Sequence, residues 1–276
     1  MLTYTLERFV TDFASASVSN PAQERTTAVT VGAVLVALAV ILMALAGLGS
    51  RWGWWYFTTG FALLKWAAYA AIAAAIVTVV AALVVRGAHR KRSLVVAAVA
   101  SMIALGVVSV PWRMLRAASS LPPIHDITTD TNDPPAFVAL HDRRPGAINS
   151  VEYGGPQVAA KQHAGYPDIA PAMLSTSTAQ ALDRAVAVAH QLGWTVVAVD
   201  TATGRMESSD RTPWFGFTDD QVVRVRPTPS GSRVDIRSLS RVGGSDVGAN
   251  ARRIRRFLTA INNVHMRPDT SKPGPS

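Results

Sequence analysis

Three long apolar runs occupy the first half of the chain. Ala28–Leu48 contains 21 uncharged, mostly apolar residues, enough for a helix to cross a bilayer. The second run, 61–85, carries one charge, Lys65, near its start, where a lysine side chain can reach the headgroups. The third run, 94–112, reaches Pro111-Trp112-Arg113, a sequence that predicts a helix end. We therefore expect three membrane spans.

The apolar pattern changes in the second half. Apolar positions three and four apart predict a helix over 178–192, with Ser177 and Gln180 as a capping box and Gly193 as the stop. A second helix is expected at about 246–264. Between them, alternating apolar and polar positions predict strands at 194–200, 205–209, 219–226 and 232–240.

This order of elements, joined by short connections, favours an antiparallel sheet of about four strands with helices packed on one face. We expect an α+β C-terminal domain attached to a three-helix transmembrane anchor. Alternation in the last two strands directs one set of side chains to the core: Val223, Val225, Val234 and Ile236. The opposite set is charged: Arg224, Arg226, Arg233, Asp235 and Arg237.

The segment between the two halves is rich in Pro, Asp and Thr and has no apolar periodicity. Its spaced acids, Asp126, Asp130 and Asp133, suggest calcium ligands, but they fit no twelve-residue calcium loop. We favour a linker whose Asp and Thr side chains bond to the local backbone. The expected divisions are a cytoplasmic tail (1–26), a transmembrane region (27–116), a linker (117–145), the α+β domain (146–265) and a disordered tail (266–276).

The net charge of +9 is concentrated in the apolar half. Residues 1–116 carry 10 Lys/Arg and 3 Asp/Glu, a net charge of +7, and residues 117–276 carry 17 and 15, a net charge of +2. This distribution argues for membrane orientation rather than nucleic-acid binding. Six basic residues fall on the N-terminal side of the membrane: Arg8, Arg25, Arg86, Arg90, Lys91 and Arg92. Three fall on the other: Arg51, Arg113 and Arg116.

The positive-inside rule therefore places the N-terminus in the cytoplasm and, after three spans, the C-terminal domain outside. We expect a multi-pass protein of the inner or plasma membrane. The charged fraction of 16% is well below the roughly 25% of soluble chains. Cysteine is absent, which excludes disulfides, thiolate catalysis and Cys-ligated metals.

Several sequence motifs in the second half of the chain are distinctive, and they occur in a fixed order. They are Pro123–Ile127, Glu152–Pro156, Trp214–Asp220, Val234–Arg241 and Gly244–Ile254. Together they resemble the bacterial domain-of-unknown-function family DUF1499. The resemblance covers about residues 121–262 and leaves the membrane half outside. It implies a domain boundary near residue 120 and carries over no activity, substrate or catalytic residue.

The densest group of polar residues lies where a strand end meets a Gly-Gly turn that opens a helix. A helix N-terminus presents free N–H groups and a positive dipole end, which favour anions, and arginines add charge and fork-shaped donors. We predict a site for a phosphate, carboxylate or lipid headgroup at Arg237, Ser240, Arg241, Ser245, Asp246, Asn250 and Arg253.

A structural role competes with that prediction. Ser245 can cap the helix, and Asp246 can neutralise Arg237 or Arg241. Trp214–Phe217 is a second candidate, either a ligand platform or a corner of the core, and we favour the core. Asp219 and Asp220 cannot act as a facing acid pair within one strand, because adjacent residues point to opposite faces. The arginines at 252, 253, 255 and 256 form a basic helix patch or a solvated face.

The sequence contains no Walker loop, HExxH, G-x-S-x-G or Rossmann motif, and no catalytic residue, metal ligand or cofactor is predicted. The function expected is a non-enzymatic envelope module that binds an anionic ligand or a partner near the bilayer, and not nucleic acid. A membrane-tethered enzyme, such as a hydrolase, would instead show a pocket with converging titratable groups. A structural subunit would show a stripe of small residues on its spans, for pairing with another membrane protein.

Overall fold

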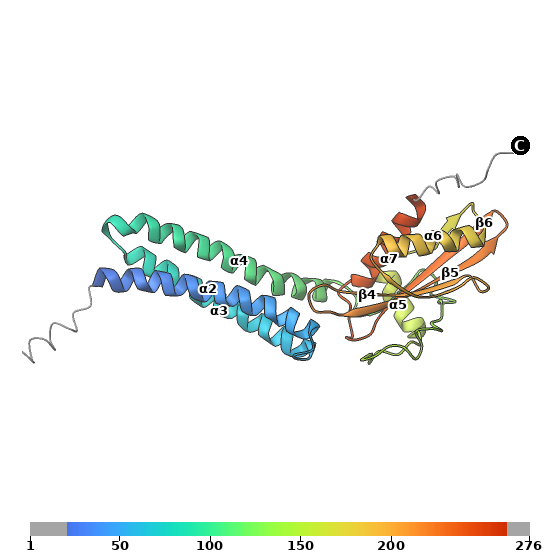
Figure 1. The fold of residues 1–276 in the computed structure, drawn as a ribbon, viewed down its shortest axis with the longest axis horizontal. Helices are drawn as coiled ribbons and strands as arrows, with labels where there is room; N and C mark the ends of the chain where they lie inside the picture. The colour runs from blue at the N-terminus through green and yellow to red at the C-terminus, as the bar shows by residue number, and fades with distance from the viewer. Residues whose placement is uncertain (1–20, 264–276) are drawn as a thin grey trace, which may run out of the picture. The chain divides into compact units, whose positions relative to one another are not determined.

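The computed structural model describes residues 21–263, so the expected disordered tail and most of the cytoplasmic tail lie outside the described residues. The chain divides into two compact units, Met1–Arg113 and Met114–Ser276. Long helices make up the described part of the first unit, and the second is built on a β-sheet (Figure 1).

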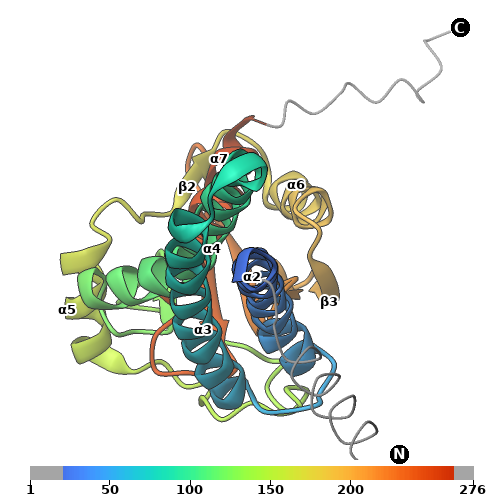
Figure 2. The same ribbon diagram turned by 90° about the vertical axis from the view of Figure 1, so that its left-hand side faces the viewer.

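The described part of the first unit holds α2 (Pro21–Arg51), α3 (Phe57–Val84) and most of α4 (Arg90–Ser120), which continues past the unit's last residue, Arg113. The short 3-10 helix η1 (Gly87–His89) precedes α4. Figure 2 shows the three long helices side by side. Each is long and apolar enough to cross a membrane, since about 20 apolar residues suffice. The three predicted spans are confirmed as membrane-capable helices, and the protein is a membrane protein.

Small side chains let these helices approach closely. Gly32 of α2 lies against Thr78 of α3, and a Cβ at position 32 would overlap the threonine hydroxyl. Thr78 is fully buried and donates its hydroxyl to the carbonyl of Ala74 in its own helix. A shared core joins all three helices: Val36, Ala39, Ala71, Ala74, Ala100, Ala104 and Val107. Close packing of small residues supplies van der Waals contact where lipid offers no hydrophobic drive.

The predicted helix end at Pro111 is wrong. Proline lies inside α4, which continues to Ser120. Proline removes one backbone hydrogen bond from the helix ladder, but the residues on either side keep the helical periodicity. The helix therefore extends beyond the apolar run that marked its expected end.

The second unit contains an antiparallel six-stranded sheet. Its strands are β1 (Asp126–Thr128), β2 (Ala172–Leu174), β3 (Thr195–Asp200), β4 (Arg205–Arg211), β5 (Thr218–Thr228) and β6 (Gly231–Ser240). The order is β1-β6-β5-β4-β3, and β2 also pairs with β6. The four predicted strands are β3 to β6, so the predicted α+β class is confirmed. The two additional strands, β1 and β2, are three residues long and too short for a periodicity to reveal them.

Helices α6 (Thr178–Gln191) and α7 (Ala249–Asn263) cover one face of this sheet. The predicted capping box of α6 is present, with Ser177 and Gln180 bonded to each other's backbone N–H. The predicted core residues Val223, Val225, Val234 and Ile236 are buried beneath these helices. Trp194 stacks on Phe257 of α7 at 5.6 Å between ring centroids.

The opposite face is covered by the irregular segment that follows β1, residues 129–154, which we call the cover. Phe137 and Leu140 pack there against Val222 and Leu239 of the sheet. The buried carboxylate of Glu207 in β4 accepts the backbone N–H groups of residues 138, 139 and 140 at 2.8–3.0 Å. The cover therefore buries Asp235 and Arg237 of β6 and partly shields the other charged residues of β5 and β6 from solvent.

Most of the expected linker is thus part of the sheet domain. From Asp126 onward it contributes β1, the second apolar cluster and several ion pairs to β5 and β6. These contacts run through single carboxylates and backbone N–H groups, so they leave no apolar periodicity in the sequence. Helix α5 (Gly155–Gly165) follows this cover, and its Gln162 side chain forms two hydrogen bonds with the backbone of Thr128 in β1.

Candidate functional site

The predicted site residues lie at one end of the sheet, but they divide between its two faces. Ser240, Asn250 and Arg253 lie on the side of α7, whereas Arg237 and Arg241 lie under the irregular cover. The predicted residues therefore do not form one site.

Arg237 is enclosed. Its guanidinium donates to both carboxylate oxygens of Asp126, at 2.9 and 2.8 Å, and to the carbonyls of Pro135 and Val151. The rings of Phe137 and Tyr153 lie 5.2 and 5.5 Å from it. Only 3% of the side chain is exposed. This arginine fastens the cover to the sheet, and four of its five N–H donors are used in doing so.

The surroundings of Arg237 also raise the pKa of a neighbouring tyrosine, Tyr153. Burial, reinforced by the negative charge of Asp126, raises the pKa of Tyr153 to about 12, although Arg237 acts in the opposite direction. The tyrosine therefore stays neutral throughout the physiological range, and its hydroxyl cannot serve as a base there.

On the other face, Arg253 connects α7 to the β4–β5 hairpin. Its guanidinium donates to Asp210 and Asp219 at 2.9 and 2.7 Å and to the side-chain oxygen of Asn250 at 2.8 Å. The Asn250 amide donates in turn to the carbonyl of His125 and the hydroxyl of Ser240. A buried, mutually satisfied network of this kind fixes one packing of α7 on the sheet.

The start of α7 is already occupied by a side chain. Asp246 accepts the backbone N–H groups of Gly248 and Asn250 at 2.9 and 2.6 Å, and the Ser245 hydroxyl accepts that of Val247. Burial raises the pKa of Asp246, and the two N–H donors oppose that rise. The N–H groups of residues 247, 248 and 250 are thus bound within the chain.

Arg241 lies in a different environment. It donates to both oxygens of Asp220, the shortest distance being 2.8 Å, and to the hydroxyl of Ser209 at 3.3 Å. A second arginine, Arg144 from the cover, donates to the same carboxylate at 2.7 Å. Asp220 is fully buried, while 5% of the Arg144 side chain and 12% of the Arg241 side chain are exposed.

One carboxylate therefore faces two guanidinium groups, which leaves the Arg144–Arg241 pair with one positive charge in excess. The Nη2 atom of Arg144 is buried and has no hydrogen-bond partner among residues 21–263. An unpaired buried donor, above all a charged one, is costly. The opposite excess occurs on the other face, where Arg253 lies between two carboxylates.

Sequence reasoning missed Arg144 because it falls in the Pro-rich segment expected to be a linker. It also considered Asp220 only as half of an acid pair. The prediction that Asp219 and Asp220 point to opposite faces is confirmed, because they contact Arg253 and Arg241 respectively. The dipeptide Arg143-Arg144 was the one local sign of a cationic site in this segment. The burial of Arg144 depends on residues that are distant in the sequence.

A second cluster of charges lies further along the covered face. Asp130 accepts hydrogen bonds from Arg224, Arg226 and Arg233 at 2.9–3.2 Å. The same three guanidinium groups contact the buried carboxylate of Asp235. Burial alone would raise the pKa of Asp130, but the N–H of Asp133 and the three arginines hold it below its usual value. These spaced acids are thus ion-pair partners of β5 and β6.

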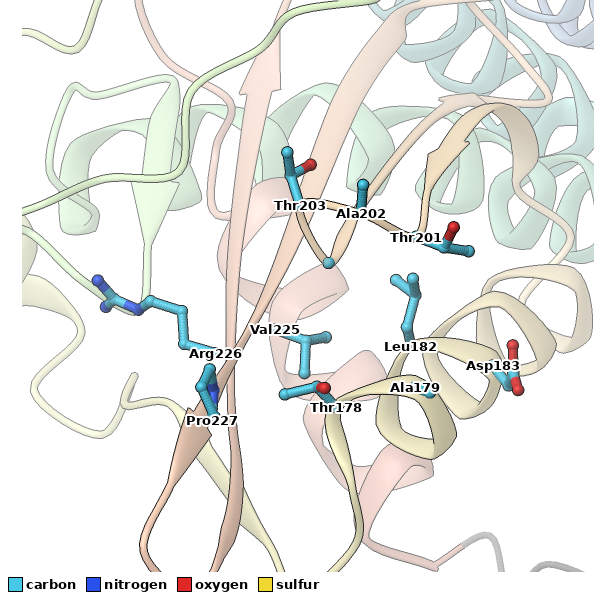
Figure 3. A pocket seen from close by; sticks show the side chains of 11 residues that line it. Thr178, Ala179, Leu182, Asp183, Thr201, Ala202, Thr203, Val225, Arg226 and Pro227 are labelled. Carbon is cyan, nitrogen blue, oxygen red and sulfur yellow. The ribbon is translucent and has the colours of Figure 1, made fainter.

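A pocket of about 270 Å3 lies beside this cluster, between α6, the β3–β4 turn and β5 (Figure 3). Leu182 and Val225 provide apolar walls, and Thr178, Thr203, Asp183 and Arg226 provide the polar ones. Its volume lies just below the roughly 300–1,000 Å3 of typical ligand pockets. Asp183 and Arg226 are its charged residues, and they come from different walls.

The aromatic segment and the basic residues of α7 are largely engaged in packing and ion pairs. Phe215 is buried and stacks on Phe217 at 5.4 Å, with Trp214 edge-on at 5.0 Å. Arg255 forms two hydrogen bonds to Asp168, at 2.6 and 2.7 Å. Of the arginines in the expected basic helix patch, Arg253 is buried by the network described above.

Comparison with known proteins agrees with this domain assignment. No curated protein matches the chain. A family model described as "Protein of unknown function (DUF1499)" matches residues 126–261, which begin at β1 and end within α7. The resemblance expected from the sequence is confirmed: the matched part of the sheet domain is similar to DUF1499, and the same chain carries three membrane-capable helices.

Proposed function

We propose that the protein is a membrane-anchored, non-enzymatic module of the cell envelope whose sheet domain binds an anionic ligand at the Arg144–Arg241 pair. The observation that carries this proposal is the excess positive charge around Asp220, together with the Nη2 of Arg144, which has no hydrogen-bond partner in the described part of the chain. A phosphate or carboxylate would accept hydrogen bonds from guanidinium donors in the geometry that arginine favours.

This proposal narrows the predicted set of residues. Arg237 and Arg253 each have carboxylate partners of their own, so we assign them to holding the domain together. Arg241 keeps the binding role. Arg144 joins it from the cover. The Ser209 hydroxyl accepts from Arg241 and donates to Asp220 at 2.6 Å, so it holds these two groups in place.

Chain connection supports a location near the bilayer. Five residues separate Ser120, the last residue of α4, from Asp126, the first residue of β1. At about 3.5 Å per residue the intervening chain spans at most about 20 Å. Leu239 and Asp220 pair in register beside Asp126, so the proposed anion site lies at this tethered end of the sheet.

The orientation is also proposed. The excess of basic residues at the N-terminal end and in the loop before α4 supports a cytoplasmic N-terminus and a sheet domain outside the cytoplasm. An anionic headgroup or envelope polymer would then be the available ligand.

The test is native mass spectrometry of the full-length protein extracted gently from its own membrane, followed by titration with inorganic phosphate. We expect Arg144→Gln to lose the phosphate response, together with any bound mass that phosphate displaces from the wild type. Arg143→Gln, an exposed neighbour of equal charge, should retain both. Because Asp220 keeps Arg241 as a partner, Arg144→Gln should fold, and circular dichroism checks this. Equal phosphate binding by wild type and folded Arg144→Gln would overturn the proposal.

A further inference from the structure

A groove of about 450 Å3 lies in the helical unit, between α2 and the N-terminal turns of α4. Its α2 wall is Thr26, Val29, Thr30, Ala33, Val34 and Ala37. Its α4 wall, with the preceding turn, is His89, Arg92, Ser93 and Val96. The spacing on each wall follows one helical face, and the volume lies within the range of typical ligand pockets.

The chemistry of the groove changes along its length. The end near the start of both helices has hydroxyl groups from Thr26 and Thr30, the imidazole of His89 and the guanidinium of Arg92. The remaining length, toward Ala37 and Val96, is apolar. A ligand that fits this gradient has a charged head at one end and a hydrocarbon chain at the other.

The dimensions match a lipid tail. Thr26 and Ala37 are eleven residues apart, and a rise of about 1.5 Å per residue places them about 16 Å apart along the helix axis. This is about one leaflet of a hydrocarbon core roughly 30 Å thick. The groove therefore extends from the headgroup region to about the middle of a bilayer.

Charge at the mouth favours an anionic head. Five basic residues lie at this end of the helices: Arg25, Arg86, Arg90, Lys91 and Arg92. Glu24 is the one carboxylate in the sequence between residues 21 and 120. Arg92 lines the groove and is exposed, so its guanidinium is accessible to a phosphate.

We propose that this groove binds one anionic phospholipid of the surrounding bilayer, with the acyl chain along Ala33 and Ala37 and the phosphate at Arg92 and His89. This site is separate from the Arg144–Arg241 pair and does not depend on it. The small side chains at positions 33 and 37 keep the groove open, and Arg92 selects the charge of the lipid.

The experiment measures lipid retention by the full-length protein in micelles. The probes are phosphatidylglycerol and phosphatidylcholine with matched acyl chains, and native mass spectrometry counts the lipids bound. We expect one phosphatidylglycerol to be retained in preference to phosphatidylcholine. The double variant Ala33→Leu, Ala37→Leu fills the groove and should lower retention at least tenfold. Ala70→Leu, Ala73→Leu is its matched control, because both positions are exposed on α3.

Charge selection is tested separately. Arg92→Gln should reduce the preference for phosphatidylglycerol about fivefold, because one basic residue near anionic lipid contributes about 1 kcal/mol. Lys91→Gln removes the same charge from an exposed residue outside the groove wall and should keep most of the preference. Arg144→Gln should leave the bound lipid unchanged. Equal retention of both lipids by wild type, or undiminished retention by the groove-filled variant, would overturn the proposal.

Discussion

Buried carboxylates determine how the cover packs on the sheet. Glu207 accepts three consecutive backbone N–H groups from the cover, and Asp126 forms a two-point pair with Arg237. Burying a charge is unfavourable unless it is paired and hydrogen-bonded. An isolated buried charge would therefore destabilise the fold. Because each of these acids is paired, each one holds the cover in a single position.

The ion pairs of Asp130 make the stability of the covered face depend on pH. Its pKa is held below the usual value in the folded protein, so its stabilising effect is complete above its unfolded pKa of about 3.9. The effect is lost as the pH falls through the lower, folded pKa. Asp246 has the opposite sign: its raised pKa costs stability once the pH rises above its unfolded pKa.

We expect Asp130→Asn to weaken the covered face by about 2 kcal/mol at pH 7, because it removes hydrogen bonds between charged groups. The difference from wild type should shrink below about pH 4, as wild-type Asp130 also becomes protonated. Hydrogen exchange of the β5 and β6 amides in the full-length protein measures this free energy of opening. Asp142→Asn, at an exposed carboxylate, is the control. A difference that stays constant from pH 7 to pH 3 would contradict the assignment.

Among the helices, α2 and α3 approach each other closely at Gly32. Gly32 has Thr78 of α3 directly against it. Neither helix can rotate or slide there without creating a gap or an overlap. Gly106 of α4 offers a matched comparison, since no described heavy atom lies within 4 Å of a Cβ placed there.

Gly32→Ala should therefore lower stability by about 1–3 kcal/mol, because overpacking forces the two helices apart. Gly106→Ala should be neutral or slightly stabilising, since alanine favours a helix over glycine by about 1 kcal/mol. Thermal unfolding of the full-length protein in detergent, followed by circular dichroism at the helical band, compares the two. If both variants melt at or above the wild-type temperature, the helices do not pack through Gly32.

At the scale of the whole molecule, a membrane-crossing α4 would place the loop before it and the sheet domain after it on opposite sides of the membrane. The natural chain contains no cysteine, so single cysteines report their location without background. Lys91 lies at the start of α4, and Asp142 lies in the cover of the sheet domain; both are exposed.

We expect an impermeant maleimide to label Asp142→Cys in intact cells and Lys91→Cys only after the cells are permeabilised. This outcome follows from a cytoplasmic loop before α4 and an external sheet domain. Labelling with the reverse pattern would invert the proposed orientation, and labelling of both in intact cells would contradict the assignment of α4 as a span.

Local pattern was enough to predict the spans, the capped helix α6 and the strands β3 to β6. The spans are long apolar runs, whereas α6 and the strands repeat their apolar positions with their own periods. Both signals are visible in a short stretch of sequence. The Ser177–Gln180 capping box is equally local, because both partners lie within one helical turn. The sequence by itself therefore determined the class of fold and the membrane anchor.

Tertiary structure alone decided which charges meet. Arg144 and Asp220 are 76 residues apart in the chain, and no periodicity connects them. Arg237 and Arg253 belonged to the predicted binding site, and only the fold gave each of them a carboxylate partner. The interaction of a charge depends on distance and burial, and both quantities exist only once the chain has folded. For the same reason, composition suggested a linker where the folded chain forms the cover of the sheet.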